Sequence, residues 1–218
     1  MSSSLARLAP LSGFAFVVLL VASFFVADPP ASDGATEEVV SYWVDNETAN
    51  IVAALLGGLT AVAAVWFGGS VRAALLGAEG EPGRLAAVAF AGFLAIGLGV
   101  AMWSGFQFAA ADTAGDVPAE TTQALAVLVE WFFLPFAVGI FLAFLASGIA
   151  ILRHGGLPRW LGFLALPIPL FFFTPIWFIG MIGAAVWLLA ASWLLLRAPA
   201  VGSGTGGAPP AEPAHGPG

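Results

Sequence analysis

Residues 125–152 read LAVLVEWFFLPFAVGIFLAFLASGIAIL, and the eight residues that follow, 153–160, read RHGGLPRW. Glu130 is the only charged side chain in the longer stretch. A run of this length crosses about 30 Å of hydrocarbon and is too apolar for a helix that faces water. The two arginines and the histidine after it indicate that this end lies on the cytoplasmic side. Together the two segments predict a membrane helix of known direction, from which the other spans can be placed.

The composition is that of a chain embedded in a membrane. Of its 218 residues, 60% are hydrophobic and only 9% are charged, with a mean hydropathy of +0.99, whereas about a quarter of the residues in a soluble domain are charged. Cysteine is absent, which excludes disulfides, thiolate metal sites and cysteine nucleophiles. The net charge of −7 argues against nucleic acid, which requires a basic surface. We expect an all-α, polytopic transmembrane helix bundle in one domain.

Charged loops and proline- or glycine-rich breaks divide the chain into six predicted spans. About 20 apolar residues cross the hydrocarbon as a helix, and runs of this kind lie at residues 8–27, 51–71, 85–108, 125–152, 158–174 and 176–196. For the first run we favour a retained helix over a cleaved signal peptide, because it is long for a signal sequence and follows a single arginine. The bundle then occupies residues 1–200, and the glycine- and proline-rich residues 201–218 are expected to form a disordered cytoplasmic tail.

The last two spans come from one uncharged run of 36 residues, 161–196. A single helix of that length would measure about 54 Å, which is too long for the bilayer at ordinary tilts. Pro167, Pro169 and Pro175 interrupt the run. We therefore expect a short fifth span, and whether it is continuous or broken stays open. Lipid tolerates non-helical backbone only where neighbouring helices or water satisfy its polar groups.

The first predicted outer loop, residues 28–49, is acidic and has no basic residue. Val39, Val40, Trp43 and Val44 lie on one face of a helix, because they are spaced by one, four and five positions. A tryptophan on such a face suits the membrane–water boundary. We expect a short amphipathic helix here that lies on the outer membrane surface.

Charge placement gives the expected orientation. All six arginines fall on one side of the predicted bundle: Arg7, Arg72, Arg84, Arg153, Arg159 and Arg197. Nine of the 13 acids fall in the two large loops on the other side, residues 28–49 and 109–122. Because arginine and lysine bias sets the orientation, both termini are expected to be cytoplasmic. The lack of lysine and the abundance of alanine and glycine are typical of a GC-rich bacterium, so we expect a multi-pass protein of the bacterial cytoplasmic (inner) membrane.

Small residues at four-residue spacing let helices approach closely in lipid. Gly97, Ala101 and Gly105 form such a ridge in the third predicted span. A second ridge comprises Ala91, Ala95 and Gly99. We expect the first ridge to face another helix and the third span to be the central helix of the bundle.

Glu130 is a charged residue within a predicted span, where acids are usually functional. Counting about 20 residues back from Leu152 at the inner boundary puts the outer boundary near residue 133. A structural acid at the outer interface is therefore our first interpretation, and a ligand or proton site is the alternative. The same count brings Gln107 to the outer end of its span, so Glu130, Gln107 and Glu120 form a candidate polar cluster on the outer face.

A second candidate site is the cytoplasmic loop that carries Arg153, His154 and Arg159, where His154 could approach Glu79 or Glu81. A His–Glu pair alone is a weak sign of catalysis, and a solvated loop is the plainer interpretation. The sequence contains no glycine-rich phosphate loop, zinc-ligand spacing or nucleophile elbow. We expect no catalytic residue, no cofactor and no metal site.

Two motifs resemble recurring features of a bacterial protein group: EEVVSYWVDN (37–46) before the second span, and LRHGGLPRWLG (152–162) between the fourth and fifth. They are similar to those of small, uncharacterised, actinobacterial-like integral membrane proteins with six helices, of the domain-of-unknown-function type. The resemblance covers residues 8–197. It implies a six-helix membrane protein and supplies no activity or catalytic residue.

Three functional hypotheses follow. The first is a non-enzymatic membrane protein that acts through packing, through contact with the lipid bilayer, or through a protein partner or second copy of itself. The second is a transporter or channel component for an apolar or neutral solute, which uses the broken fifth span. The third is a membrane-bound enzyme with a site near Glu130 or His154. A cavity lined by Phe171, Phe172 and Phe173 would favour the second, convergent titratable groups the third, and a filled bundle the first.

The predicted topology can be tested by labelling. In intact cells, an impermeant thiol reagent should label a cysteine introduced at Asp33, because that loop is expected outside, and should not label one introduced at Gly204. The native chain has no cysteine, so the reagent has no other thiol to label in this protein. Labelling at Gly204 would contradict the six-span topology.

Overall fold

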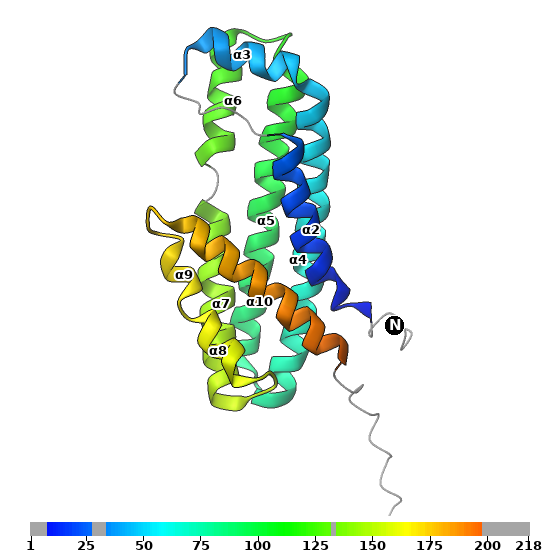
Figure 1. Ribbon diagram of the computed structural model, residues 1–218, viewed down its shortest axis with the longest axis vertical. Helices are drawn as coiled ribbons and strands as arrows, with labels where there is room; N and C mark the ends of the chain where they lie inside the picture. Colours follow the sequence, from blue (N-terminus) through cyan, green and yellow to red (C-terminus); the bar gives the residue numbers. More distant parts are fainter. Residues whose placement is uncertain (1–7, 28–33, 132–133, 198–218) are drawn as a thin grey trace, which may run out of the picture.

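The computed structural model describes residues 8–27, 34–131 and 134–197, which are helical and contain no strand. The described helices are α2 (Leu11–Val26), α3 (Thr36–Asp45), α4 (Glu47–Glu79), α5 (Arg84–Thr113), α6 (Ala119–Trp131), α7 (Leu134–His154), α8 (Arg159–Ala165), α9 (Ile168–Phe171) and α10 (Trp177–Arg197) (Figure 1). The all-α prediction is confirmed for these residues. The predicted tail, 201–218, and Arg7 lie outside the described residues, as do Asp28 and Asp33.

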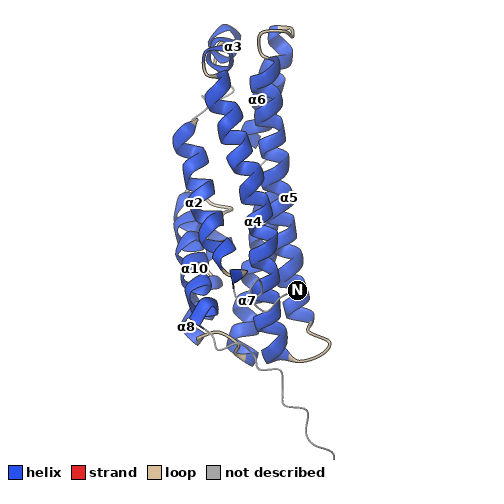
Figure 2. Cartoon of the chain, turned by 90° about the vertical axis from the view of Figure 1, so that its right-hand side faces the viewer, coloured by secondary structure: helices blue, strands red, loops and turns tan. Residues whose placement is uncertain are grey.

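The helices form an elongated bundle (Figures 1 and 2). α4 and α5 run antiparallel along its whole length, and α2 packs along α4. α6 and α7 follow one another along α5, while α10 packs against α2, α8 and α9. We call the end that α3 crosses the upper end, and the end with the α4–α5 and α7–α8 loops the lower end. The five described arginines lie toward the lower end, and most described acids lie toward the upper end.

In the part of the chain that the structure describes, four helical segments are long and apolar enough to cross a membrane: α4, α5, the stretch from α6 to α7, and α10. α2 and the stretch from α8 to α9 are shorter apolar helices. α4 has 33 residues and α5 has 30, so they measure about 50 Å and 45 Å. Both exceed the hydrocarbon thickness of about 30 Å. The predicted spans 51–71 and 85–108 are therefore parts of longer helices, and a count of six spans stays a prediction.

The upper end has a small hydrophobic core of its own. Val39 and Trp43 of α3 are each only 1% exposed and pack in a cluster with alanines of α5 and with Ala126 and Val129 of α6. The predicted amphipathic helix is present, but Val39 and Trp43 contact protein instead of lying on a membrane surface. Val44, which we expected on the same face, is 46% exposed. α3 therefore covers the upper ends of α5 and α6.

The lower half is held by four aromatic side chains from four helices. Phe67 of α4 contacts Phe93 of α5, with ring centroids 5.5 Å apart, and Trp187 of α10, at 6.4 Å. Phe144 of α7 contacts the same two residues, at 6.4 Å from Phe93 and 5.1 Å from Trp187. The indole Nε1 of Trp187 donates a 3.0 Å hydrogen bond to the backbone oxygen of Leu161 in α8. This aromatic cluster therefore connects α10 to the rest of the bundle.

Glycines bring α5 and α7 into backbone contact. A Cβ atom on Gly99 would lie 2.6 Å from the backbone nitrogen of Phe136, and one on Gly139 would lie 2.5 Å from that of Ile96. A Cβ on Gly92 would overlap the backbone of Ala143 in the same interface. Since real Cβ atoms are not found at such distances from backbone atoms, α5 and α7 can pack this closely only with glycine at these positions.

The prediction that Gly97, Ala101 and Gly105 form one ridge that faces another helix is wrong. Gly97 is buried against α4, but Ala101 and Gly105 are exposed, and no atom lies within 4 Å of a Cβ built on Gly105. The residues in contact with α7, Gly92 and Gly99, are seven positions apart and share a different face of α5. Glycine and alanine are so frequent in this chain that spacing alone did not distinguish the two faces.

Glu79 closes the loop between α4 and α5. Its carboxylate accepts hydrogen bonds from the backbone N–H groups of Leu85, at 3.0 Å, and Ala86, at 2.9 Å. These groups lie in the first turn of α5, where N–H groups lack partners inside the helix. The two hydrogen bonds, with a smaller contribution from the charge of His154, hold the pKa of Glu79 below its usual value. Glu79 lies beyond the lower end of the predicted span 51–71, outside the hydrocarbon.

The glycine interface predicts a clear asymmetry between two substitutions. Gly139→Ala should lower the stability of the protein in detergent by about 1–3 kcal/mol, the usual cost of overpacking. Gly105→Ala should leave stability unchanged or raise it slightly, because its Cβ would meet no atom and alanine favours the helix. Thermal unfolding of both variants checks this, and equal effects would contradict the assigned interface.

The Glu79 cap predicts a pH dependence. Because its folded pKa is depressed, its contribution is present above the unfolded pKa of about 4.3 and is lost as the pH falls through the folded value. Glu79→Gln should therefore lower the melting temperature at pH 7, and the gap to the native chain should narrow at about pH 3. Glu81→Gln, in the same loop and exposed, is the control. A gap of equal size at both pH values would argue against the cap.

Candidate functional site

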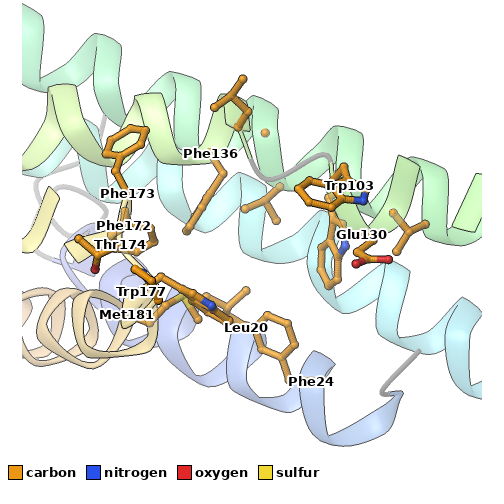
Figure 3. Close-up of a pocket in the computed structure, with 16 residues that line it drawn as sticks. Leu20, Phe24, Trp103, Glu130, Phe136, Phe172, Phe173, Thr174, Trp177 and Met181 are labelled. Atoms are coloured by element: carbon orange, nitrogen blue, oxygen red, sulfur yellow. The ribbon is translucent and has the colours of Figure 1, made fainter. Parts of the chain in front are cut away.

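A cavity of about 710 Å³ opens on the side of the bundle, between α2, α5, α7 and the α9–α10 turn and below α6 (Figure 3). Its lining residues are Leu20, Phe24, Gly99, Val100, Trp103, Val129, Glu130, Trp131, Leu134, Phe136, Phe172, Phe173, Thr174, Pro175, Trp177 and Met181. They come from distant parts of the sequence, which the α5–α7 contact and the packing of α2 and α10 bring together.

The proline-rich segment accounts for the position of the cavity. α8 ends at Ala165 and α9 ends at Phe171, so the fifth predicted span is broken. From Arg159 to Phe171 this segment rises by at most about 20 Å, which is less than the hydrocarbon thickness. A turn stabilised by backbone hydrogen bonds, such as Thr174 N–H to the oxygen of Phe171 at 3.0 Å, then leads into α10. Above this turn the α8–α9 segment supplies no helix to fill the space beside α5 and α7.

The lining is apolar with a polar upper end. Among the described residues that line it, Glu130 is the only charged side chain and Thr174 is the only hydroxyl. Figure 3 shows Glu130 beside Trp103 at one end and Phe172, Thr174, Trp177 and Met181 around the other. The Thr174 hydroxyl donates a 2.8 Å hydrogen bond to the backbone oxygen of Phe171. The carboxylate of Glu130 is therefore the main polar feature that the cavity offers to an occupant.

A second, smaller cavity of about 170 Å³ lies next to the first. The two share five lining residues: Leu20, Phe24, Phe136, Phe172 and Met181. The smaller cavity reaches inward to Phe67, Phe93 and Phe144, and its lining side chains are all apolar. Together the two cavities lead from the carboxylate of Glu130 to the aromatic cluster.

The predicted outer-face cluster is not assembled around the cavity. Gln107 is fully buried, and its Nε2 donates a 3.2 Å hydrogen bond to Oδ1 of Asn50, which links α5 to α4. Glu120 is exposed on α6, ten residues and about 15 Å of helix from Glu130. Of the three residues, only Glu130 lines the cavity. Gln107 therefore has a structural position between helices.

The cytoplasmic candidates lie on the lower surface. Arg153, His154 and Arg159 are exposed, and the charge of His154 acts on Glu79. The loop containing Gly156 packs against the end of α4, since a Cβ there would lie 2.8 Å from the oxygen of Ala74. This confirms that the two lower loops are neighbours. Among the described residues, no group of three or more histidine, aspartate or glutamate side chains is arranged to hold a metal ion.

Part of the cavity lining was foreseen from the sequence. Of the phenylalanines named in the sequence analysis, Phe172 and Phe173 line the cavity and Phe171 does not. Trp103 and the α2 residues were missed. The available signal was the set of aromatic residues near the predicted outer ends of the spans, but it does not indicate which faces of those helices meet.

Comparison with family models, with curated proteins and with solved structures found no match to this chain. The resemblance to bacterial six-helix membrane proteins therefore stays a prediction based on two short motifs.

Proposed function

We propose that this protein is a non-enzymatic membrane protein that binds an elongated, mainly apolar molecule in the lateral cavity. The observation that carries the proposal is the cavity itself, with Phe172 and Phe173 in its wall. Its volume of about 710 Å³ lies within the range of about 300–1,000 Å³ that is usual for small-molecule sites. The proposal combines lipid contact, from the first hypothesis, with an apolar solute, from the second.

The exposed apolar side chains at the opening of the cavity support access from the membrane. Leu134 and Phe173 line it and are each 56% exposed, and Trp131 is 63% exposed. Exposed apolar side chains of this size are unfavourable in water but suit contact with acyl chains. Four helical segments of the bundle are long and apolar enough to cross a membrane. A ligand dissolved in the bilayer would therefore reach the cavity sideways.

Apolar burial alone would not hold such a ligand. Lipid tails are as apolar as the cavity wall, so a molecule that leaves the bilayer gains little hydrophobic free energy. Affinity must come from shape, from contacts with the aromatic rings and from polar groups at defined positions. The aromatic walls and the single carboxylate supply these features, which makes selective binding a better explanation of the cavity than loose packing.

The enzyme and ion-transport hypotheses have less support. Catalysis usually needs several titratable groups that converge on one site, and Glu130 is the only charged side chain among the described residues of the lining. At its inner end the smaller cavity meets Phe67, Phe93 and Phe144, whose rings belong to the packed core. This arrangement favours a binding site that is open on one side over a continuous channel.

Blocking the cavity should prevent binding. Met181 lines both cavities, so Met181→Trp should fill the passage between them. In liposomes, a diazirine-labelled alkyl probe should label the native cavity wall, and Met181→Trp should reduce that labelling several-fold. Val186→Trp is the matched control, because Val186 is exposed on α10 and lines neither cavity.

Labelled residues are identified by mass spectrometry of peptides, and thermal unfolding shows whether each variant is folded. Labelling spread evenly over lipid-exposed side chains, with no loss in Met181→Trp, would refute the binding function.

A further inference from the structure

We propose that the molecule bound in the cavity carries a positive charge: it is a cationic amphiphile with an amine or quaternary ammonium group at one end and an apolar tail. This inference rests on the proposed function and adds the chemical class of the ligand. The head group would lie at the end formed by Glu130 and Trp103, and the tail would extend toward Met181.

The first observation is the chemistry of the upper end. Glu130 brings a carboxylate to a wall that also contains Trp103 and Trp131, and Figure 3 shows Glu130 next to Trp103. Indole faces attract cations through their ring quadrupole. A carboxylate attracts the same cation directly. Both kinds of group favour an ammonium head, and neither favours an anionic one.

The second observation is the distribution of charge along the bundle. Glu130 lines the cavity, and seven further described acids lie above it, on α3, α6, the neighbouring ends of α4 and α5 and the loop between α5 and α6: Glu37, Glu38, Asp45, Glu47, Asp112, Asp116 and Glu120. Glu120 is about 15 Å of helix from Glu130, so these charges act on the cavity at long range. The described arginines lie toward the lower end, and none lines the cavity. The summed charges of a protein raise the local concentration of ligands of the opposite sign, and salt weakens this effect over such distances. The field of the protein therefore attracts cations to the cavity and disfavours phosphate or sulfate head groups.

The third observation is the path available to a tail. From Glu130 the larger cavity leads past Phe136 to Met181, and the smaller one continues to the rings of Phe67 and Phe144. This inner part offers no polar group, so burial of a second charge there would be costly. A charged occupant would therefore carry its charge at one end only, as a cationic amphiphile does.

Competition among molecules with the same tail tests the inference. The full-length protein in a neutral maltoside detergent is labelled with the diazirine alkyl probe in the presence of hexadecyltrimethylammonium, hexadecanol or hexadecyl sulfate. The cation should compete at least ten-fold better than the alcohol, and the sulfate should compete least. Added salt should reduce the advantage of the cation, because it screens exposed charge.

Substitution of the acid locates the effect. Glu130→Gln should lower competition by the cation to the level of the alcohol while leaving competition by the alcohol unchanged. Glu120→Gln, an exposed acid on the same helix outside the lining, should leave both unchanged. The comparison of three head groups on the native chain does not depend on the folding of any variant.

The outcomes separate the two proposals. Equal competition by all three molecules, with no effect of Glu130→Gln, would overturn the cationic preference and leave the apolar binding site intact. Stronger competition by the sulfate would also overturn it. No competition by any molecule, together with unchanged labelling in Met181→Trp, would overturn the binding function as well.

Discussion

The close contact between α5 and α7 is the constraint on which the rest of the structure depends. Without side chains at Gly92, Gly99 and Gly139, the two backbones approach to a distance that no larger residue permits. In lipid, helices gain no hydrophobic free energy by associating, so dispersion contact at small residues is a main source of stability. This contact fixes the position of α7 along the axis of α5. It therefore brings Phe136 close to Gly99 and Val100 in the cavity wall.

The second determinant is the short length of the α8–α9 segment. Three prolines break the segment between Arg159 and α10, and its two short helices together measure at most about 20 Å, less than the thickness of a bilayer's hydrocarbon layer. A bundle of equally long helices would have filled the same space with side chains. Here the aromatic cluster packs the lower half, and the unfilled volume lies above it, between α2, α5 and the α9–α10 turn. The cavity is thus a consequence of where the prolines lie in the sequence.

Hydropathy and charge predicted where the helices lie in the sequence more accurately than which helix faces contact one another. Apolar runs located the long apolar helices, and the prolines marked where the fifth span could be interrupted, because both depend on local sequence; whether that span is continuous or broken stayed open. The partners of each helix face depend on the whole bundle, so the ridge through Ala101 was assigned to packing although it is exposed. Trp43 was expected at the membrane surface, but it is buried in a cluster with residues of α5 and α6. Glu130 was singled out from the sequence and lines the cavity, but other lining residues such as Trp103 and Leu20 come from helices that no spacing rule connects to it.

The central claim is that the lateral cavity holds an elongated apolar molecule. It is tested most directly by an experimental structure of the protein, purified from its own membrane in lipid nanodiscs and enlarged with a bound antibody fragment. We expect continuous density that begins near the carboxylate of Glu130 and ends near Met181. A cavity closed by a tilt of α2 or α10, or filled by side chains of the protein itself, would contradict the claim.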